Sequence, residues 1–253
     1  MRESALVRGI HIIDAIAARD GHMRYTEIRE SILNGLNPRS TSRLLHDLCQ
    51  VGVLKKNADN AYELTHKIFL WSRAMSEGDN LADITRPWLK RISEQYGITS
   101  ALFVRIGDHM MCLSRVTAPS GTSLIPVGEC RPLNIIRSGG IFYMPSEALN
   151  DITDLYEQVL DQIADDPNAD PTPDAIRIII ENYRKEEIMD DEGGIYPGCR
   201  RLAVPLQDNG RVIGVLTTGA TTDLYLQSGF RDALLADLKI AAGHIVQEAR
   251  EFY

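Results

Sequence analysis

A helix start at Asn37-Pro38 is the feature that most restricts how the first part of this chain can fold. Asn favours the N-cap of a helix, and Pro favours the first helical position, where a missing N–H removes no hydrogen bond. Apolar residues then recur at helical spacing and stop before Gly52: Leu44, Leu45, Leu48 and Val51. The pattern predicts a short amphipathic helix whose other face is polar.

Two further helices are predicted before this one. Apolar residues at three- and four-residue spacing indicate a first helix that ends near Asp20-Gly21: Leu6, Ile10, Ile13 and Ala17. A second, short helix begins near Thr26. It ends at Asn34-Gly35, because glycine readily takes the left-handed conformation that closes a helix.

A short hairpin is predicted after the third helix, with residues 53–56 and 61–64 on either side of a polar turn at 57–60. Three helices and a hairpin in this order are typical of a winged helix-turn-helix, which places the first turns of its third helix in the major groove of DNA. Taken singly, Arg39 and Arg43 are more typical of a solvated helix face than of residues that read DNA, and the combined order of elements reverses that preference. The predicted DNA-binding residues are Arg8, Arg39, Ser40, Ser42, Arg43, His46, Lys55 and Lys56.

The charge of the chain is distributed unevenly. Its 27 Lys and Arg against 35 Asp and Glu give a net charge of −8, which as an average argues against a protein that simply coats nucleic acid. When the chain is divided after Gly78, the first segment carries 11 basic and 9 acidic residues and the second carries 16 and 26. The net charges are therefore +2 and −10, so the acidic excess belongs to the segment that need not contact phosphate.

The composition excludes several classes of protein. No apolar run approaches the ~18 residues of a membrane span, and Arg8, His11 and Asp14 interrupt any apolar stretch of a signal peptide. The four cysteines show no CxxC or other metal spacing, which favours reduced thiols in a cytoplasmic protein: Cys49, Cys112, Cys130 and Cys199. We expect no metal and no cofactor.

The middle of the chain predicts two connecting helices, over residues 66–75 and 81–97, with a kink or restart at Pro87. We therefore expect a winged helix-turn-helix domain at 1–66, a linker helix at 67–80 and a second domain at 81–253. Two ordinary core helices of a single domain remain the alternative.

Two hairpins are predicted in the second domain, at Gly107-Asp108 and at Asn209-Gly210. If Asn209 and Gly210 form a two-residue loop, Leu206 lies opposite Ile213, Val204 opposite Val215 and Leu202 opposite Thr217. Arg201 then lies opposite Thr218, Ala203 opposite Leu216 and Pro205 opposite Gly214 on the other face. A three-residue loop would break this register.

The first segment resembles the DNA-binding domain of IclR-type bacterial transcriptional regulators. The resemblance rests on Leu6-Val7-Arg8-Gly9-Ile10, Gly35-Leu36, Ser42-Arg43-Leu44-Leu45, Leu48, Gly52-Val53-Leu54 and Tyr62-Glu63-Leu64, and the second domain is similar as well. This chain departs from the family in Asn37-Pro38-Arg39-Ser40, where Pro-Lys-Ser-Thr is usual, and in Thr65, where a glycine is common. The departures leave the fold expectation intact and the operator sequence open.

The resemblance implies an α+β fold: an N-terminal winged helix-turn-helix followed by a GAF/profilin-like effector-binding domain with a mainly antiparallel sheet flanked by helices. It also implies effector contacts at Gly128, Arg137, Ser138, Gly139, Asp190, Asp191, Arg201, Leu216 and Thr218. Arg137 and Arg201 stand where the family often has a small residue and a cysteine. If both face the cavity they suit a carboxylate, sulfonate or phosphate, and otherwise they point to solvent or pair with nearby acids.

These observations predict a DNA-binding transcriptional regulator whose operator affinity is controlled by a small carboxylate or aromatic-acid effector. We expect a homodimer, or a homotetramer, on a palindromic or pseudopalindromic operator, which controls a catabolic operon as a repressor or an activator. One alternative is a pathway enzyme fused to a DNA-binding domain, although no HExxH, GxSxG or phosphate-loop motif appears. Another is a module whose helix-turn-helix binds a protein partner.

Overall fold

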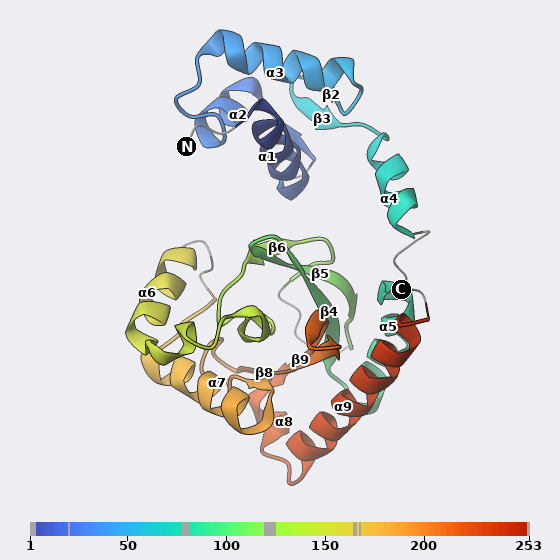
Figure 1. The fold of residues 1–253 in the computed structure, drawn as a ribbon, viewed down its shortest axis with the longest axis vertical. Helices are drawn as coiled ribbons and strands as arrows, with labels where there is room; N and C mark the ends of the chain where they lie inside the picture. Colours follow the sequence, from blue (N-terminus) through green and yellow to red (C-terminus); the bar gives the residue numbers. More distant parts are fainter. Residues whose placement is uncertain are drawn as a thin grey trace. The chain divides into compact units, whose positions relative to one another are not determined.

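A computed structural model of the chain describes residues 4–19, 21–76, 81–118, 125–163, 166 and 168–251. The chain divides into two compact units, Met1–Asp79 and Asn80–Tyr253 (Figure 1). None of the described helices is long and apolar enough to cross a membrane.

The first unit contains the predicted three helices and hairpin. The helices are α1 (Ala5–Ala18), α2 (Tyr25–Ser31) and α3 (Pro38–Gln50), and α4 (Ile68–Ser76) follows them. A small antiparallel sheet of order β1-β3-β2 combines the hairpin strands β2 (Leu54–Lys56) and β3 (Tyr62–Leu64) with β1 (His22–Met23), which the sequence did not indicate. The hydrophobic core of this unit contains side chains from α1, α2, α3 and the hairpin, including Ile12, Ile28, Leu45 and Leu54.

Helix α2 ends three residues before the predicted end at Asn34. The carbonyl of Ile28 accepts hydrogen bonds from both the Ile32 and the Leu33 N–H, which closes the helix early. Gly35 has the expected positive φ, but it lies in the turn between α2 and α3 and does not end α2 directly. The start of α3 is where the sequence places it, because Asn37 is the N-cap and Pro38 the first helical residue.

The second unit is built on a six-stranded sheet of order β6-β5-β4-β9-β8-β7, in which every neighbouring pair is antiparallel. Its strands are β4 (Thr99–Ile106), β5 (His109–Val116), β6 (Cys130–Pro132), β7 (Met189–Asp190), β8 (Cys199–Asp208) and β9 (Arg211–Thr221). The predicted α+β class, with a mainly antiparallel sheet flanked by helices, is confirmed.

Helices cover both faces of this sheet (Figure 1). On one face α5 (Leu81–Tyr96) and α9 (Phe230–Ala249) pack with Leu202 and Leu216 of the sheet. On the other face lie η1 (Gly140–Tyr143), α6 (Ile152–Gln162) and α7 (Pro173–Glu186), which pack with Phe103 and Ala203. The short helices η2 (Ala148–Asn150) and α8 (Thr222–Tyr225) connect these elements.

Helix α5 continues through Pro87, so of the predicted kink or restart at this residue the restart is wrong. Proline removes one helical N–H donor and leaves the carbonyl four residues earlier without its partner. Here both Pro87 and Asp83 are exposed, so water can solvate that carbonyl and the helix need not break.

The predicted register of the β8–β9 hairpin is correct only next to the turn. Asp208 pairs with Arg211 and Gln207 with Val212, but a bulge between Leu206 and Gln207 then shifts the pairing by one residue. Consequently Arg201 lies opposite Gly219, not Thr218, and the other predicted pairs shift in the same way: Leu202 with Thr218, Ala203 with Thr217, Val204 with Leu216, Pro205 with Val215 and Leu206 with Gly214. The β4–β5 hairpin has a similar irregularity between Leu102 and Phe103, after which Ala101 pairs with Arg115.

Candidate functional site

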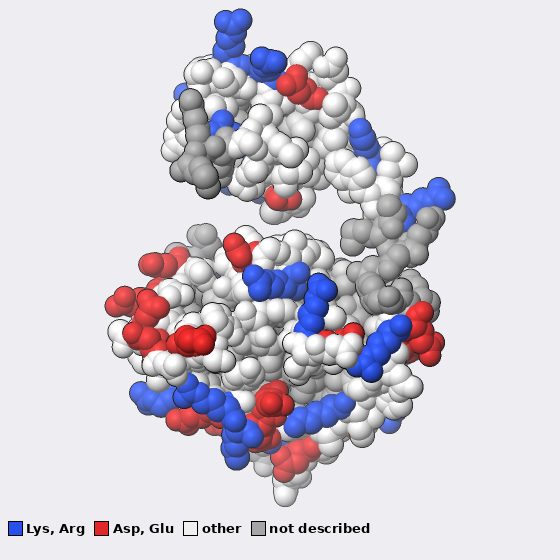
Figure 2. Space-filling view, viewed as in Figure 1, with Lys and Arg blue, Asp and Glu red and all other residues white. Residues whose placement is uncertain are grey.

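The N-terminal half of α3 presents a basic, exposed face. The side-chain oxygen of Asn37 accepts a hydrogen bond from the Ser40 N–H at 2.8 Å and so fixes the start of the helix. Thr41 and Leu45 are fully buried, which turns the opposite side outward. The residues on that outer side are Arg39, Ser42, Arg43 and His46, which are exposed, and Ser40, which is half-buried. Figure 2 shows basic side chains standing over this end of α3.

Arg39 and Arg43 are four residues apart and therefore neighbours on the helix surface. Neither forms an ion pair or side-chain hydrogen bond with another residue in the described part of the chain. The two lysines of the hairpin differ from them. The Nζ of Lys55 lies 2.8 Å from a carboxylate oxygen of Glu63, and the Nζ of Lys56 lies 5.1 Å from the centre of the Tyr62 ring.

Arg8 lies half-buried on α1 and interacts within the chain. Of the residues predicted to bind DNA, the structure therefore brings Arg39, Ser42, Arg43 and His46 together on one exposed helix face. Lys55 and Lys56 share the hairpin strand β2, and Arg8 belongs to a different helix.

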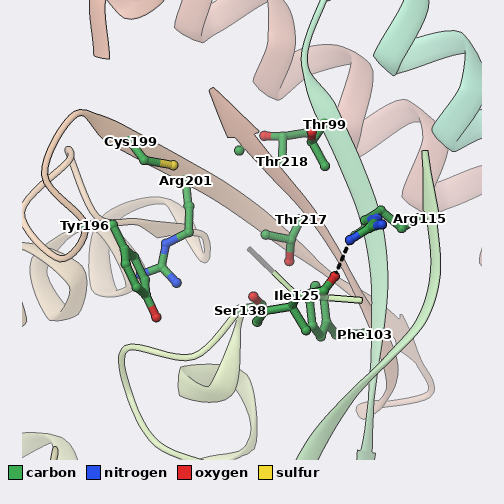
Figure 3. A pocket seen from close by; sticks show the side chains of 12 residues that line it. Thr99, Phe103, Arg115, Ile125, Ser138, Tyr196, Cys199, Arg201, Thr217 and Thr218 are labelled. Atoms are coloured by element: carbon green, nitrogen blue, oxygen red, sulfur yellow. Dashed lines mark hydrogen bonds between the residues drawn. The ribbon is translucent and has the colours of Figure 1, made fainter. Parts of the chain in front are cut away.

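The second unit contains a cavity of about 60 Å³ on the sheet face that also carries η1, α6 and α7 (Figure 3). Residues directly opposite each other in a sheet share a face, so Thr99, Gly219 and Arg201 form one row across β4, β9 and β8. The middle residue of that row has no side chain, which leaves space between its neighbours. The cavity lining consists of Thr99, Ala101, Phe103, Arg115, Ile125, Ser138, Tyr196, Cys199, Arg201, Thr217, Thr218 and Gly219.

Arg201 is held rigidly in the wall of this cavity. Its Nε donates to Asp191 Oδ2 at 2.7 Å, and its backbone N–H donates to Asp191 Oδ1 at 2.8 Å. Its guanidinium carbon lies 4.5 Å from the centre of the Tyr196 ring. Burial alone would lower the pKa of Arg201, but the charge of Asp191 raises it above its ordinary value, so the side chain stays charged.

Three polar atoms in the cavity lining are buried and have no hydrogen-bond partner among the described residues: Thr99 Oγ1, Thr217 Oγ1 and Arg201 Nη2. A buried donor left without a partner costs about 1–3 kcal/mol, so such groups are normally satisfied by protein, water or ligand. One guanidinium edge and two hydroxyls in one cavity are the donor set that an anionic or hydroxylated small molecule needs.

Arg137 does not line the cavity, although the resemblance implied an effector contact there. Its Nη1 donates to Asp166 Oδ2 at 2.8 Å and to the Tyr196 hydroxyl oxygen at 3.0 Å, and the Tyr196 hydroxyl donates to the same carboxylate oxygen at 3.0 Å. Burial would raise the pKa of Asp166, but the hydrogen bonds from Arg137 and Tyr196 hold it below its usual range. Arg137 thus pairs with an acid and supports Tyr196, whose ring contacts Arg201.

The two adjacent carboxylates, Asp190 and Asp191, serve opposite faces of the sheet. Asp191 pairs with Arg201 on the cavity face. Asp190 is also fully buried, but it accepts from Arg200 Nε and Nη2 at 2.9 and 2.7 Å, and from Arg231 of α9 at 3.2 Å. Consecutive strand residues point to opposite faces, so Asp190 ties the sheet to α9 and is not part of the cavity.

Some of the remaining predicted effector contacts line the cavity and others do not. Ser138 and Thr218 line the cavity, although the Thr218 hydroxyl already donates to the Leu202 carbonyl at 3.2 Å. Gly139 precedes η1 with φ +82°, and a Cβ there would overlap the Val215 side chain. Two of the predicted residues lie outside the cavity: Leu216 is buried on the opposite face against α5 and α9 because of the shifted register, and Gly128 is exposed and is not part of the lining.

Several lining residues were not predicted, among them Thr99, Arg115, Tyr196 and Thr217. Arg115 Nη1 donates to the Ile125 carbonyl at 2.6 Å. Alternation along β4, β5 and β9 would have found Thr99, Arg115 and Thr217 if the register had been known, whereas Tyr196 lies in the segment before β8. The register depends on the two bulges, in the β4–β5 and β8–β9 hairpins, and no turn motif in the sequence predicts them.

Solved structures of the same fold cover almost the whole chain. The crystal structure of an IclR-family transcriptional regulator from Brucella abortus covers 98% of this chain and 95% of its own, with a TM-score of 0.73 and 18% identity. This chain has the IclR-type fold. An IclR homolog from Microbacterium hydrocarbonoxydans, solved in complex with 4-hydroxybenzoate, covers 98% of this chain and 100% of its own, with a TM-score of 0.71 and 20% identity.

In sequence, the Pca regulon regulatory protein of Pseudomonas putida is 26% identical over 244 residues, which are 92% of this chain and 81% of that protein. No family model matches the chain. The resemblance to IclR-type regulators is confirmed, and these similar proteins are named as regulators, not as enzymes.

Proposed function

We propose that this IclR-like chain is a DNA-binding transcriptional regulator whose operator affinity changes when a small organic acid binds in the cavity of its second unit. One observation carries the proposal. Among the described residues, arginines without a partner stand on an exposed recognition-type helix in one unit, and a buried guanidinium edge without a hydrogen-bond partner lies in a cavity of the other.

The first unit supports binding to double-stranded DNA. Arg39 and Arg43 are long, exposed and free to reach guanine edges in the major groove, where a bidentate arginine gives about 1–3 kcal/mol of discrimination. Ser40, Ser42 and His46 stand beside them, and Lys56 with Lys55 on β2 suits the phosphate backbone.

A homodimer fits this role, because two copies of α3 would read the two halves of a palindromic or pseudopalindromic operator. Exposed apolar side chains on each of two helices of the first unit could be covered by a second copy: Leu6, Val7 and Ile10 on α1, and Phe69, Leu70 and Trp71 on α4. Assembly of two dimers into a tetramer is the other state to be distinguished in solution.

The second unit supports binding of an organic acid. Arg201 Nη2 is directed to donate to a carboxylate oxygen, with the hydroxyls of Thr99 and Thr217 nearby in the same cavity. Asp191 preorganises that arginine, and Ser138 and Thr218 complete the wall. A protein of the same fold was solved in complex with 4-hydroxybenzoate, which supports this class of ligand.

The genes controlled are part of the proposal. The relative from Pseudomonas putida is named for a regulon, which supports control of a set of genes here. We extend this to a catabolic operon whose substrate or product is the acid bound in the cavity.

The test combines two titrations of the full-length protein. DNA from its own upstream region should bind in a fluorescence-anisotropy assay at low salt, and Arg39→Ala with Arg43→Ala should abolish most of that binding. A panel of organic acids should include one that binds in isothermal titration, and Arg201→Gln should lose it. If DNA binding is unaffected by the loss of both arginines, the DNA-binding part of the proposal is wrong. If no acid of the panel binds, the effector part is wrong.

A further inference from the structure

Two neighbouring aspartates of the chain pair with two neighbouring arginines, one pair on each face of the sheet. On the cavity face Asp191 pairs with Arg201, and on the opposite face Asp190 pairs with Arg200, each at 2.7 Å. Both carboxylates are fully buried. Because one rigid peptide unit joins the two aspartates, a shift of either residue also displaces the other.

Strand β7, which ends at Asp190, is held to the sheet over a short length. It is two residues long, and its ladder consists of Met189 opposite Ala203 and Asp190 opposite Leu202. In contrast, β8 pairs with β9 along its entire length. The two buried ion pairs therefore contribute a large part of the interaction that holds β7 in place.

Asp190 also connects β7 to α9. Besides Arg200, it accepts a hydrogen bond from Arg231 Nε at 3.2 Å, and the same guanidinium donates to Glu186 of α7 at 3.0 and 3.1 Å. Arg231 lies in the first turn of α9. This one side chain therefore links the start of α9 to both β7 and α7.

Helix α9 packs in turn against α5, which is the first helix of the second unit (Figure 1). The Tyr96 hydroxyl of α5 donates to Asp237 Oδ2 of α9 at 2.6 Å, and the ring of Trp88 stacks on His244 with ring centres 5.0 Å apart. The chain continues from the N-terminal end of α5 into the first unit. A displacement of α9 therefore acts on the helix that follows the first unit in the chain.

We propose that Arg231 transmits acid binding in the cavity to α9 and, through α5, to the first unit. This inference rests on the proposed function and adds the route by which the cavity controls operator affinity. An anion at Arg201 Nη2 competes with Asp191 for the same positive charge, so acid binding weakens the ion pair that holds β7 on the cavity face. The resulting shift of β7 changes the contact between Asp190 and Arg231.

The full-length Arg231→Gln variant tests this route, because it removes the charged contact of α9 with Asp190 while Arg200 keeps that carboxylate paired. Isothermal titration without DNA first selects the tightest-binding acid from acetate, lactate, succinate, benzoate and 4-hydroxybenzoate. At saturation, this acid should change the wild-type dissociation constant for DNA of its own upstream region by about 5- to 150-fold in an anisotropy assay. Arg231→Gln should lose most of that change and keep the wild-type affinity for the acid.

Two further variants make the result specific. Arg250→Gln removes the same charge at the opposite end of α9, where Arg250 pairs with Asp208, and should retain the full change in DNA affinity. Arg231→Lys keeps a positive charge near Asp190 and should retain part of it. Thermal melts of each variant check that it is folded.

The outcomes separate the route from the proposed function. An Arg231→Gln variant that retains the wild-type change in DNA affinity overturns the route alone, and so do equal losses in Arg231→Gln and Arg250→Gln. A weaker affinity of Arg231→Gln for the acid also overturns it, because the substitution then acts on the cavity itself. If no acid binds to wild type, or if bound acid leaves its DNA affinity unchanged, the effector part of the proposed function is wrong together with the route.

Discussion

The arginines of α3 and the arginines of the cavity are both suited to anions, but their surroundings are opposite. Arg39 and Arg43 are exposed and unpaired among the described residues, so they can approach a polyanion but are screened by salt. Arg201 is 7% exposed and is fixed by Asp191 and Tyr196 before any ligand arrives. The first arrangement suits an extended, salt-dependent surface for DNA, and the second suits a small anion held in fixed geometry.

The largest expected effect comes from removing the support of the buried arginine. Asp191→Ala leaves Arg201 as an uncompensated buried charge and should lower the free energy of unfolding by about 3–5 kcal/mol in urea denaturation. The matched control is Asp174→Ala, which removes the exposed partner of Arg177 and should cost about 1 kcal/mol or less. Equal losses in the two variants would show that the buried pair is not special.

One methyl group added at Gly139, in the loop beside the cavity, should lower the stability of the protein. In Gly139→Ala the new Cβ would overlap the Val215 side chain, and the alanine would also have to keep the positive φ of the glycine. We therefore expect the free energy of unfolding to fall by about 3 kcal/mol. Gly128→Ala has the same backbone penalty, with φ +87° and open space around it, and should cost only about 1 kcal/mol. If the exposed glycine is as sensitive as the buried one, tight packing beside the cavity is refuted.

Substitutions on the exposed face should affect DNA binding without affecting stability. Arg39→Ala and Arg43→Ala should each weaken binding to the operator by about 1–3 kcal/mol in an anisotropy assay, while urea midpoints stay unchanged. Arg105→Ala and Arg177→Ala remove the same charge from exposed positions of the second unit and serve as controls. Similar losses from all four variants would indicate that net charge alone determines the affinity.

The smallest effect is a dependence of stability on pH through Asp166. Because the pKa of Asp166 is lowered in the folded state, its contribution is complete above the ordinary value near 4 and is lost as the pH falls through the folded value. The difference in unfolding free energy between wild type and Asp166→Asn should therefore be constant from about pH 5 to 7 and shrink below about pH 4. A difference that grows on acidification would contradict the ion pair with Arg137.

Features that depend on residues close together in the sequence were predicted correctly, and features that depend on distant residues were not. The start of α3 depends on a cap and a proline within four residues, and Asn37 with Pro38 predicted it correctly. The pairs next to the Asn209-Gly210 turn were correct for the same reason. Beyond Gln207 the pairing depends on how the strands pack against helices on both faces, and one extra residue in the bulge moved Leu216 away from the cavity.

The residues of the candidate site were predicted only in part, because their positions also depend on interactions between residues far apart in the sequence. Arg201, Ser138 and Thr218 were expected and line the cavity, whereas Arg115 comes from a strand whose register is reset by its own bulge. Arg137 was expected in the site but pairs with Asp166, 29 residues further along the chain. No local pattern in the sequence indicates a partner at that separation.

The most direct test of the account is the DNA affinity of the full-length protein measured with and without bound acid. Anisotropy titrations should be run in the absence and presence of a saturating concentration of the organic acid that binds most tightly in the calorimetric panel. For wild type we predict a change in the dissociation constant of about 5- to 150-fold, and for Arg201→Gln no change. An acid that binds to the cavity in calorimetry but leaves the wild-type DNA affinity unchanged would contradict the coupling between the two units.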